Sequence, residues 1–399
     1  MPVSITRNNG HVSRRCFMSH ASATLAAGVL FGLSGCDTGM KYRTLDRTGI
    51  RASVINSDEL PEKHLYRLAI EAGVNYWHKM GRWGEPDIFT ALDRDSFICD
   101  LTIDSIEKDG AIEEFERGLK RSGLSMIDGF KVHSVYNYPE DIREKTGILE
   151  AFGILKKQGK TRFLMLSQHR NVVVIMEAAI ESDLFDVIQV PIHPLMPHDY
   201  FLKEKKFRQY SQDRYLSIIK DASDRGIGIT SMKTVVGGPK NWEKIPNFNE
   251  KIRQYLPETD DITTALIHWT LNVPGVKTFA SSMKSHEMFY ANIRAAGGEL
   301  SEREAQGMQR FAELMSCSVC RMCGACERKN PGGIAVSDIL RYSMYYSGYD
   351  IPWEARNLYA ALPHTSRVNA ASDLDLYERA CPYHLPVAKM LRKAQKQLA

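Results

Sequence analysis

The stretch RFLMLSQHRNVVVIMEAAIESDLFDVIQV, residues 162–190, joins two short apolar runs through a longer one. The outer runs, 162–166 and 187–190, have the length and composition of buried strands, and 172–182 between them has the length of a helix. A strand, a helix and a second strand in this order form a βαβ unit, whose two strands lie parallel in one sheet. The stretch therefore predicts an α/β fold with a parallel sheet.

The same alternation continues on both sides of this stretch. Eight strand–helix repeats in about 270 residues fit a (β/α)8 TIM barrel, which typically takes about 250 residues. An open doubly wound sheet is the alternative, but no Gly-x-Gly-x-x-Gly follows the first strand to support it. The predicted strands are 53–55, 74–77, 97–101, 129–133, 162–166, 187–190, 228–231 and 276–280, and the predicted helices include 62–72, 111–121, 141–157, 172–182, 207–225, 284–295 and 301–315.

Length and charge set the frame for the remaining chain. At 399 residues we expect more than one domain, namely a barrel over 41–315 and a small cysteine-containing domain over 316–399. The formal net charge is +4, with both signs spread along the chain. No long run of one sign predicts a nucleic-acid partner.

The first 36 residues have the pattern of an export signal. Two arginines at 14–15 precede the apolar run 21–33, as in twin-arginine leaders. The run ends in Leu-Ser-Gly-Cys at 33–36, which resembles the lipobox of bacterial lipoproteins, whose cysteine is lipidated. We therefore expect a periplasmic or extracytoplasmic protein attached to the membrane by a lipid anchor; a plain leader is the alternative.

Several runs between residues 41 and 295 form an ordered series. They are Lys41–Ile50, Gly73–Tyr76, Leu124–Asp128 followed by His133, Gly159–Arg162 followed by Ser167 and Gln189, and finally Met232-Lys233 and Val276. In this unbroken order the runs resemble the aldo/keto reductases. The resemblance also points to the branch of that family with a C-terminal, α-helical, ferredoxin-like iron–sulfur domain.

The resemblance implies a catalytic Asp, Tyr, Lys and His around a carbonyl oxygen, with the tyrosine as general acid. Here His78 stands at the Asp position and Trp83 at the Tyr position, and the third strand, 97–101, lacks the lysine. Only His133 stands where the family has it. The candidate catalytic residues are therefore His133, His78 and Lys79, the last either a substitute acid or a solvated surface lysine. We expect little ordinary NADPH-dependent carbonyl reduction.

The resemblance also implies a nucleotide site. Residues at the family's nicotinamide-binding and adenosine-phosphate-binding positions are polar, although they also suit barrel and helix-start positions without a ligand. Reduced nicotinamide is not supplied outside the cytoplasm, which argues against tight dependence on NADP(H). The candidate cofactor-binding residues are Ser167, Gln168, Gln189, Ser281, Lys284 and Asn292.

Four cysteines, 317, 320, 323 and 326, are each three residues apart, and Cys381 precedes Pro382. In two-cluster ferredoxins the fourth cysteine, followed by Pro, ligates the other cluster. The economical interpretation is one [4Fe–4S] cluster on Cys317, Cys320, Cys323 and Cys381, with Cys326 left over. Three alternatives stay open: Cys326 as the fourth ligand, a zinc ion held by four thiolates, and two disulfides.

Two functions fit these patterns. The first is an exported oxidoreductase of the aldo/keto reductase type, with an unidentified small-molecule substrate and electron-transfer partner. The second is a non-catalytic barrel that binds a ligand or partner, with the cluster or zinc purely structural. His193 and His198 follow the sixth strand. Together with His78 and His133 they either line a polar pocket or are ordinary loop histidines.

Overall fold

A computed structural model of the chain describes residues 39–399 apart from 59, 61, 81–86, 170, 196–198, 204–205, 243, 258, 284, 317, 331–332 and 370. The predicted leader, 1–36, lies outside the described residues, as do Trp83, His198, Lys284 and Cys317. Within the described part, no helix combines the length and the apolar character needed to cross a membrane.

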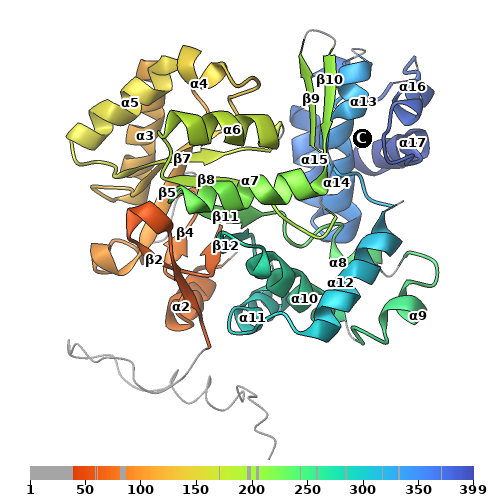
Figure 1. Cartoon of the computed structure of the whole chain (residues 1–399), viewed down its shortest axis with the longest axis horizontal. Helices are drawn as coiled ribbons and strands as arrows, with labels where there is room; N and C mark the ends of the chain where they lie inside the picture. The colour runs from red at the N-terminus through yellow and green to blue at the C-terminus, as the bar shows by residue number, and fades with distance from the viewer. Residues whose placement is uncertain are drawn as a thin grey trace, which may run out of the picture.

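Eight parallel strands close into a barrel, in which the last strand, β12, pairs with the first, β3 (Figure 1). The prediction of an eight-stranded barrel is thus confirmed, and the open-sheet alternative is wrong. Closure follows because each strand pairs with the next one along the chain and the helices between them cover the outside. The strands are β3 Ile55–Ser57, β4 Tyr76–Trp77, β5 Ile98–Ile103, β6 Gly129–His133, β7 Phe163–Ser167, β8 Val187–Pro191, β11 Gly228–Met232 and β12 Val276–Ser281.

An antiparallel hairpin of β1 (Tyr42–Thr44) and β2 (Arg51–Ser53) precedes the barrel. Its buried Leu45 packs among residues at the amino ends of the barrel strands, including Ile98 and Val187, so the hairpin covers that end. The predicted strand 53–55 is wrong in its bounds, since a bend at residue 54 separates the end of β2 from the start of β3.

Most predicted helices are confirmed, and two predictions are corrected. The predicted helix 141–157 is two helices, because the backbone at Lys145 leaves helical geometry and its ammonium bonds the carbonyl of Val135. Helix α7 begins at 212 rather than 207, because Ser211 caps it and 206–210 pairs as a strand. The barrel helices are α2 Lys63–Glu71, α3 Lys108–Ser122, α4 Asp141–Glu144, α5 Thr146–Lys157, α6 Val172–Ser182, α7 Gln212–Asp224, α8 Pro239–Trp242, α9 Phe248–Ile252, α10 Thr259–Asn272, α11 His286–Ala295 and α12 Glu302–Met315; a second hairpin is β9 Asp199–Lys203 with β10 Lys206–Tyr210.

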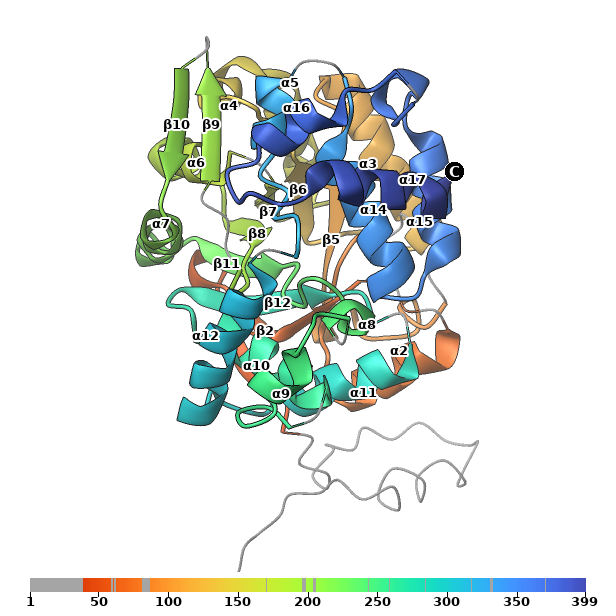
Figure 2. The same ribbon diagram turned by 90° about the vertical axis from the view of Figure 1, so that its right-hand side faces the viewer.

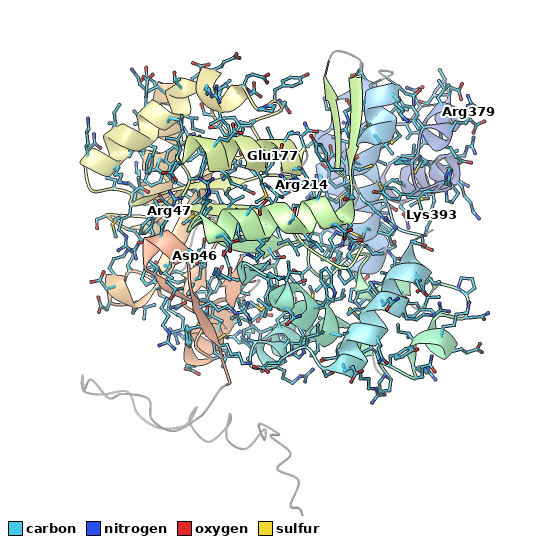
Figure 3. All side chains as sticks on the ribbon, in the orientation of Figure 1. Asp46, Arg47, Glu177, Arg214, Arg379 and Lys393 are labelled. Atoms are coloured by element: carbon cyan, nitrogen blue, oxygen red, sulfur yellow. The ribbon has the colours of Figure 1, made fainter. Side chains whose placement is uncertain are left out.

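Neighbouring barrel helices are also joined on the surface. On α7, Arg214 forms an ion pair of 2.8 Å with Glu177 on α6, and both side chains lie on the outer face (Figure 3). Both are more than a third exposed, so we expect the pair to add little stability. At the start of α12, Ser301 and Glu304 form a capping box.

The tail after α12 is helical in its described residues and has a core of its own. Buried Ile339, Tyr359 and Leu391 belong to this core, together with Cys326 and Cys381. A separate core supports the predicted boundary near residue 316. The tail helices are α13 Ala325–Lys329, α14 Val336–Gly348, α15 Pro352–Ala361, α16 Leu374–Arg379 and α17 Val387–Leu398.

The tail packs against one end of the barrel (Figures 1 and 2). Its contact includes the segment that follows β11, where Tyr349 donates its hydroxyl to the carbonyl of Val235. Gly348 and Gly238 meet so closely that a Cβ on Gly238 would lie 2.7 Å from the Gly348 backbone. Since this segment leaves the carboxyl end of β11, the tail lies at the end where barrel active sites are found.

Candidate functional site at the barrel mouth

A buried charge cluster lies inside the barrel. Lys131 Nζ, on β6, is 2.5 Å from Asp100 Oδ1 on β5, and His78 Nδ1, just after β4, is 2.9 Å from the same oxygen. Lys131 also contacts the His78 ring directly, with 3.1 Å between Nζ and Nε2. Tyr76 donates its hydroxyl to Asp100 Oδ2 at 3.1 Å, and burial raises its pKa well above the usual range, so the phenol stays protonated.

Strand alternation explains why these side chains meet. On β5, the residues on either side of Asp100, Cys99 and Leu101, point outward into the hydrophobic core between the strands and the helices. Asp100 therefore points into the barrel. On β6 the same argument turns Lys131 inward, because Phe130 and Val132 pack outward. The interior of such barrels is usually filled by branched apolar residues, and a charged pair there is a departure that indicates a functional role.

The interior has further polar groups around this pair. Among the described residues, no hydrogen-bond partner is present for the buried side-chain oxygens of Asn56, Thr102, Thr230 and Thr278. Each of these residues is at most 3% exposed. Buried polar atoms are normally paired, so the barrel interior retains hydrogen-bonding capacity for water or a polar ligand.

His133, the family-position histidine, lies at the carboxyl end of β6. Its Nδ1 is 2.7 Å from Asp104 Oδ1, and its Nε2 is 3.1 Å from Nε2 of His169. Burial, with positive Lys233 as the next cause, lowers the pKa of His169 well below its usual range. His169 is therefore neutral and a weak base, and its Nε2 shares a hydrogen bond with Nε2 of His133, which orients that ring.

Lys79 and His193 also lie at this mouth. Lys79 Nζ is 2.7 Å from Asp58 Oδ2, which also accepts a hydrogen bond from Ser282 at 2.9 Å. At 29% exposure this lysine is paired and half-buried, so the solvated-lysine alternative is wrong. Burial, then positive Lys233 and Arg321, lowers the pKa of His193 to about 3.

Among the candidate nucleotide-binding residues that the structure describes, four form two hydrogen-bonded pairs and a fifth bonds elsewhere. Ser167 Oγ donates to Gln189 Oε1 at 3.4 Å, and Asn292 Nδ2 donates to Ser281 Oγ at 2.7 Å. Gln168 donates instead to the carbonyl of Tyr136 at 3.0 Å. These contacts already use part of the hydrogen-bonding capacity that a nicotinamide or phosphate would need.

Sequence reasoning missed Asp100 and Lys131. The signal was present, because both are charged residues at alternate positions within otherwise apolar strands. The resemblance to the aldo/keto reductases implies a catalytic lysine on the third strand only. The structure has the aspartate on that strand and the lysine on the fourth.

Four described cysteines gather in the tail. Cys320, Cys323, Cys326 and Cys381 are free thiols, so no disulfide joins any two of them. Burial raises the pKa of Cys320 well above its usual range, and the other three sulfurs add to the rise. Burial likewise raises the pKa of Cys323 to about 11 and that of Cys326 to about 12. A bound cation would reverse this situation by stabilising the thiolates.

Backbone geometry and short hydrogen bonds hold these thiols together. Cys320 Sγ accepts the backbone N–H of Met322 at 3.4 Å. Asn330 Nδ2 donates to the carbonyl of Cys326 at 3.0 Å and to that of Leu376 at 3.1 Å. Because Leu376 belongs to the helix that precedes Cys381, this amide ties the two distant cysteine segments.

The thiol group and the barrel mouth share one electrostatic environment. Arg321, within the cysteine run, is one of the charges that lower the pKa of His193. Arg341, on tail helix α14, together with Lys79, contributes to the low pKa of His169. Positive charges of the tail thus act on the histidines of the mouth.

Comparisons with known proteins bear on the fold. No family model matches the chain, and no curated protein matches it. Among solved structures, the aldo-keto reductase AKR11C1 from Bacillus halodurans in its holo form is similar, with a TM-score of 0.53 and 17% identity, over 69% of this chain and 96% of that one. Its apo form gives a TM-score of 0.52 and 17% identity, over 69% and 97%. The chain therefore has the eight-stranded parallel barrel fold that the aldo-keto reductases use.

Proposed function

We propose that the chain is an exported, lipid-anchored oxidoreductase of the aldo/keto reductase type, with one [4Fe–4S] cluster in its tail. The observation that carries this proposal is the contact of the tail with the carboxyl end of the barrel, where Tyr349 donates to the carbonyl of Val235 and Arg321, within the cysteine run, adds to the low pKa of His193. A redox group on the tail thiols would then lie at the end of the barrel that holds the mouth. Small-molecule substrate and electron-transfer partner are both unidentified.

The spacing of the cysteines in the sequence supports iron–sulfur over zinc. Structural zinc sites usually separate their two pairs of cysteines by a longer loop. Here cysteines 317, 320, 323 and 326 follow one another at intervals of three residues, as in ferredoxin motifs. We assign Cys317, Cys320, Cys323 and Cys381 as ligands, with Cys326 left over.

When bound, such a cluster supplies one-electron transfer. The chain's own residues supply the protons and the positioning. His133, oriented by Asp104 and next to neutral His169, is the proton donor at the mouth. Lys131, bonded to Asp100 beside His78, would place an ammonium group at the base of the mouth, where it would donate a hydrogen bond to an oxygen that becomes negative.

NADP(H) is not required in this proposal. The nucleotide candidates are engaged with one another, Ser167 with Gln189 and Ser281 with Asn292. An exported enzyme also lacks a supply of reduced nicotinamide. The cluster therefore takes the role of electron carrier that the nucleotide has in the family.

The second candidate function is a non-catalytic barrel that binds a ligand or partner. The observation in its favour is that Cys326 and Cys381 belong to the buried core of the tail, where Asn330 also ties the backbones of α13 and α16 together. In that case the metal group, cluster or zinc, would stabilise the tail only.

The deciding experiment starts from anaerobic purification, followed by iron, sulfide and zinc analysis and a titration with NADPH. Turnover of carbonyl and other oxidised small molecules is then measured with dithionite-reduced viologen as donor. The enzyme proposal expects turnover that His133→Ala lowers while iron content is unchanged. A protein with intact iron and no turnover of any substrate supports the binding function. For the anchor, Cys36→Ser should move the protein from the membrane to the soluble fraction.

A further inference from the structure

Two histidines and a glutamate meet on the rim of the barrel, away from the tail thiols. His64 Nε2, in the first turn of α2, lies 3.1 Å from His286 Nε2, at the start of α11. Their rings are stacked, with 5.3 Å between centroids. Glu62 Oε2 lies 3.2 Å from His64 Nδ1. One ligand atom from each of the three residues falls within 4.8 Å of the other two.

We propose that Glu62, His64 and His286 form a site for a borderline divalent metal ion, of which Zn²⁺ is the most available. Zinc–nitrogen bonds of about 2.0–2.1 Å at tetrahedral angles place two imidazole nitrogens about 3.3 Å apart. The observed 3.1 Å between the two Nε2 atoms is close to this value, so little movement is needed. Imidazole with a carboxylate favours zinc or nickel over calcium or magnesium.

The glutamate decides between a cation and an anion at this place. Two imidazoles alone could hold a phosphate, but a carboxylate next to them repels an anion and attracts a cation. Hydrogen bonding from His64 Nδ1–H to Glu62 also leaves the Nε2 lone pair facing His286. A carboxylate that orients a ligating histidine in this way is a common feature of zinc sites.

The exposure of the three residues fits a site that is completed by water. His64 and Glu62 are each 53% exposed at their side chains, and His286 also lies at the surface. Two or three protein ligands leave open positions on the metal, which water would occupy. We therefore expect reversible binding rather than the permanent metal of a closed structural site.

The location of the site gives it a consequence for the fold. Helix α2 follows β3, the first barrel strand, and α11 follows β12, the last one. The barrel is closed by the pairing of these two strands over only three residue pairs, such as Phe279 with Ile55. A metal on His64 and His286 would join the helices across this seam, and a ligand that binds only the folded state raises its stability.

The test uses the full-length protein, purified with its tail metal in place, in wild-type form and as His64→Ala, His286→Ala and Glu62→Gln variants. His364→Ala is the matched control, because His364 is also exposed and lies in the tail. Equilibrium dialysis against zinc chloride is followed by metal analysis, and thermal unfolding is recorded with and without zinc. Cobalt chloride serves as a second probe, because cobalt on thiolates gives an intense near-ultraviolet band that imidazole ligands lack.

We expect wild type and the control to bind one zinc more per chain than either alanine variant, and Glu62→Gln to raise the zinc dissociation constant by about tenfold or more. Zinc should raise the melting temperature of wild type and the control only. Cobalt bound at this site should lack the thiolate band. Equal zinc binding by wild type and both alanine variants, with no difference in the zinc-induced shift, would overturn the proposal. Both outcomes are independent of turnover and of the tail cluster.

Discussion

Lys131 Nζ lies 2.5 Å from Asp100 Oδ1 inside the barrel, and neither side chain is more than 2% exposed. Removing two charges from water is costly, and a buried ion pair roughly offsets that cost only while both partners are present. A hydrophobic pair of similar size would serve stability equally well. The pair, with His78 bonded to the same carboxylate, is therefore best explained by chemistry at the mouth.

Lys131→Met should strongly destabilise the protein, because it removes the ammonium that balances the buried carboxylate of Asp100, which then keeps only His78 and Tyr76 as side-chain partners. The expected loss is about 3–5 kcal/mol in the free energy of unfolding, which is the range for breaking a buried pair. Denaturant unfolding followed by far-ultraviolet circular dichroism measures it. The double variant Lys131→Met, Asp100→Asn should recover much of the loss.

The matched control is Lys220→Met, since Lys220 pairs with Asp224 on the surface of α7. Exposed pairs contribute little, so this variant should unfold like wild type. A Lys131→Met protein as stable as the control would show that the buried carboxylate takes up a proton at little cost, and the charged-pair interpretation would fail.

The barrel could be predicted from the sequence because each strand is a short apolar run between turn residues. The predicted bounds of a strand were wrong where an apolar run continues through a bend in the backbone. At residue 54, β2 ends and β3 begins without any change in composition. The second strand of the extra hairpin, 206–210, was predicted as the start of a helix. Its five polar and aromatic residues have neither helical nor strand periodicity of their own.

The candidate site was only partly predictable. His78 and His133 were found because a family position marks each of them. Asp100 and Lys131 were missed because their partnership depends on the register between β5 and β6, which places Thr102 opposite Lys131. Register in a parallel barrel is set by closure of the whole sheet, and a local motif does not contain it.

NADPH oxidation with simple aldehydes should be absent or very slow. Positioned proton transfer contributes about 10²–10⁴-fold, and in the proposed alignment with the aldo/keto reductases the catalytic tyrosine is replaced by Trp83, which cannot donate a proton. Loss of absorbance at 340 nm, with a conventional aldo/keto reductase as positive control, measures the rate. Robust oxidation would refute the prediction, and its loss in Lys79→Met or His78→Ala would then identify the replacement acid.

Stability should fall below neutral pH partly through His193. Burial holds its pKa at about 3 in the folded protein, whereas an unfolded histidine titrates near 6.5. As the pH falls through about 6.5, the unfolded chain takes up a proton that the folded protein refuses, so the free energy of unfolding decreases. Between pH 7 and 5 this one group should lower it by about 2 kcal/mol.

The measurement compares denaturant unfolding of wild type and His193→Gln at the two pH values. The glutamine variant should lose less stability on acidification, and His364→Gln, an exposed control, should lose as much as wild type. Identical pH dependence in wild type and His193→Gln would mean that His193 is protonated in the folded protein.

The sharpest prediction concerns which cysteine completes the cluster. Cys381→Ser should lower the iron content and bleach the visible chromophore, whereas Cys326→Ser should leave both largely intact. The reason is the Cys-Pro pair at 381–382, which in duplicated ferredoxin motifs belongs to the cysteine that reaches across to the other cluster. Tail helices should also loosen in the Cys381 variant, because metal binding is coupled to folding and Cys381 lies far along the chain from Cys320.

Cys326 and Cys381 have similar surroundings in the structure. Both are buried in the tail core, and both contribute to the raised pKa of Cys320. Iron analysis per folded protein, after anaerobic purification, separates the two models. Cys99→Ser is the control, because Cys99 is a buried free thiol in the barrel; it should retain all the iron. If Cys326→Ser loses the iron and Cys381→Ser retains it, the fourth ligand is local to the cysteine run, and Cys381 is only a buried thiol of the tail core.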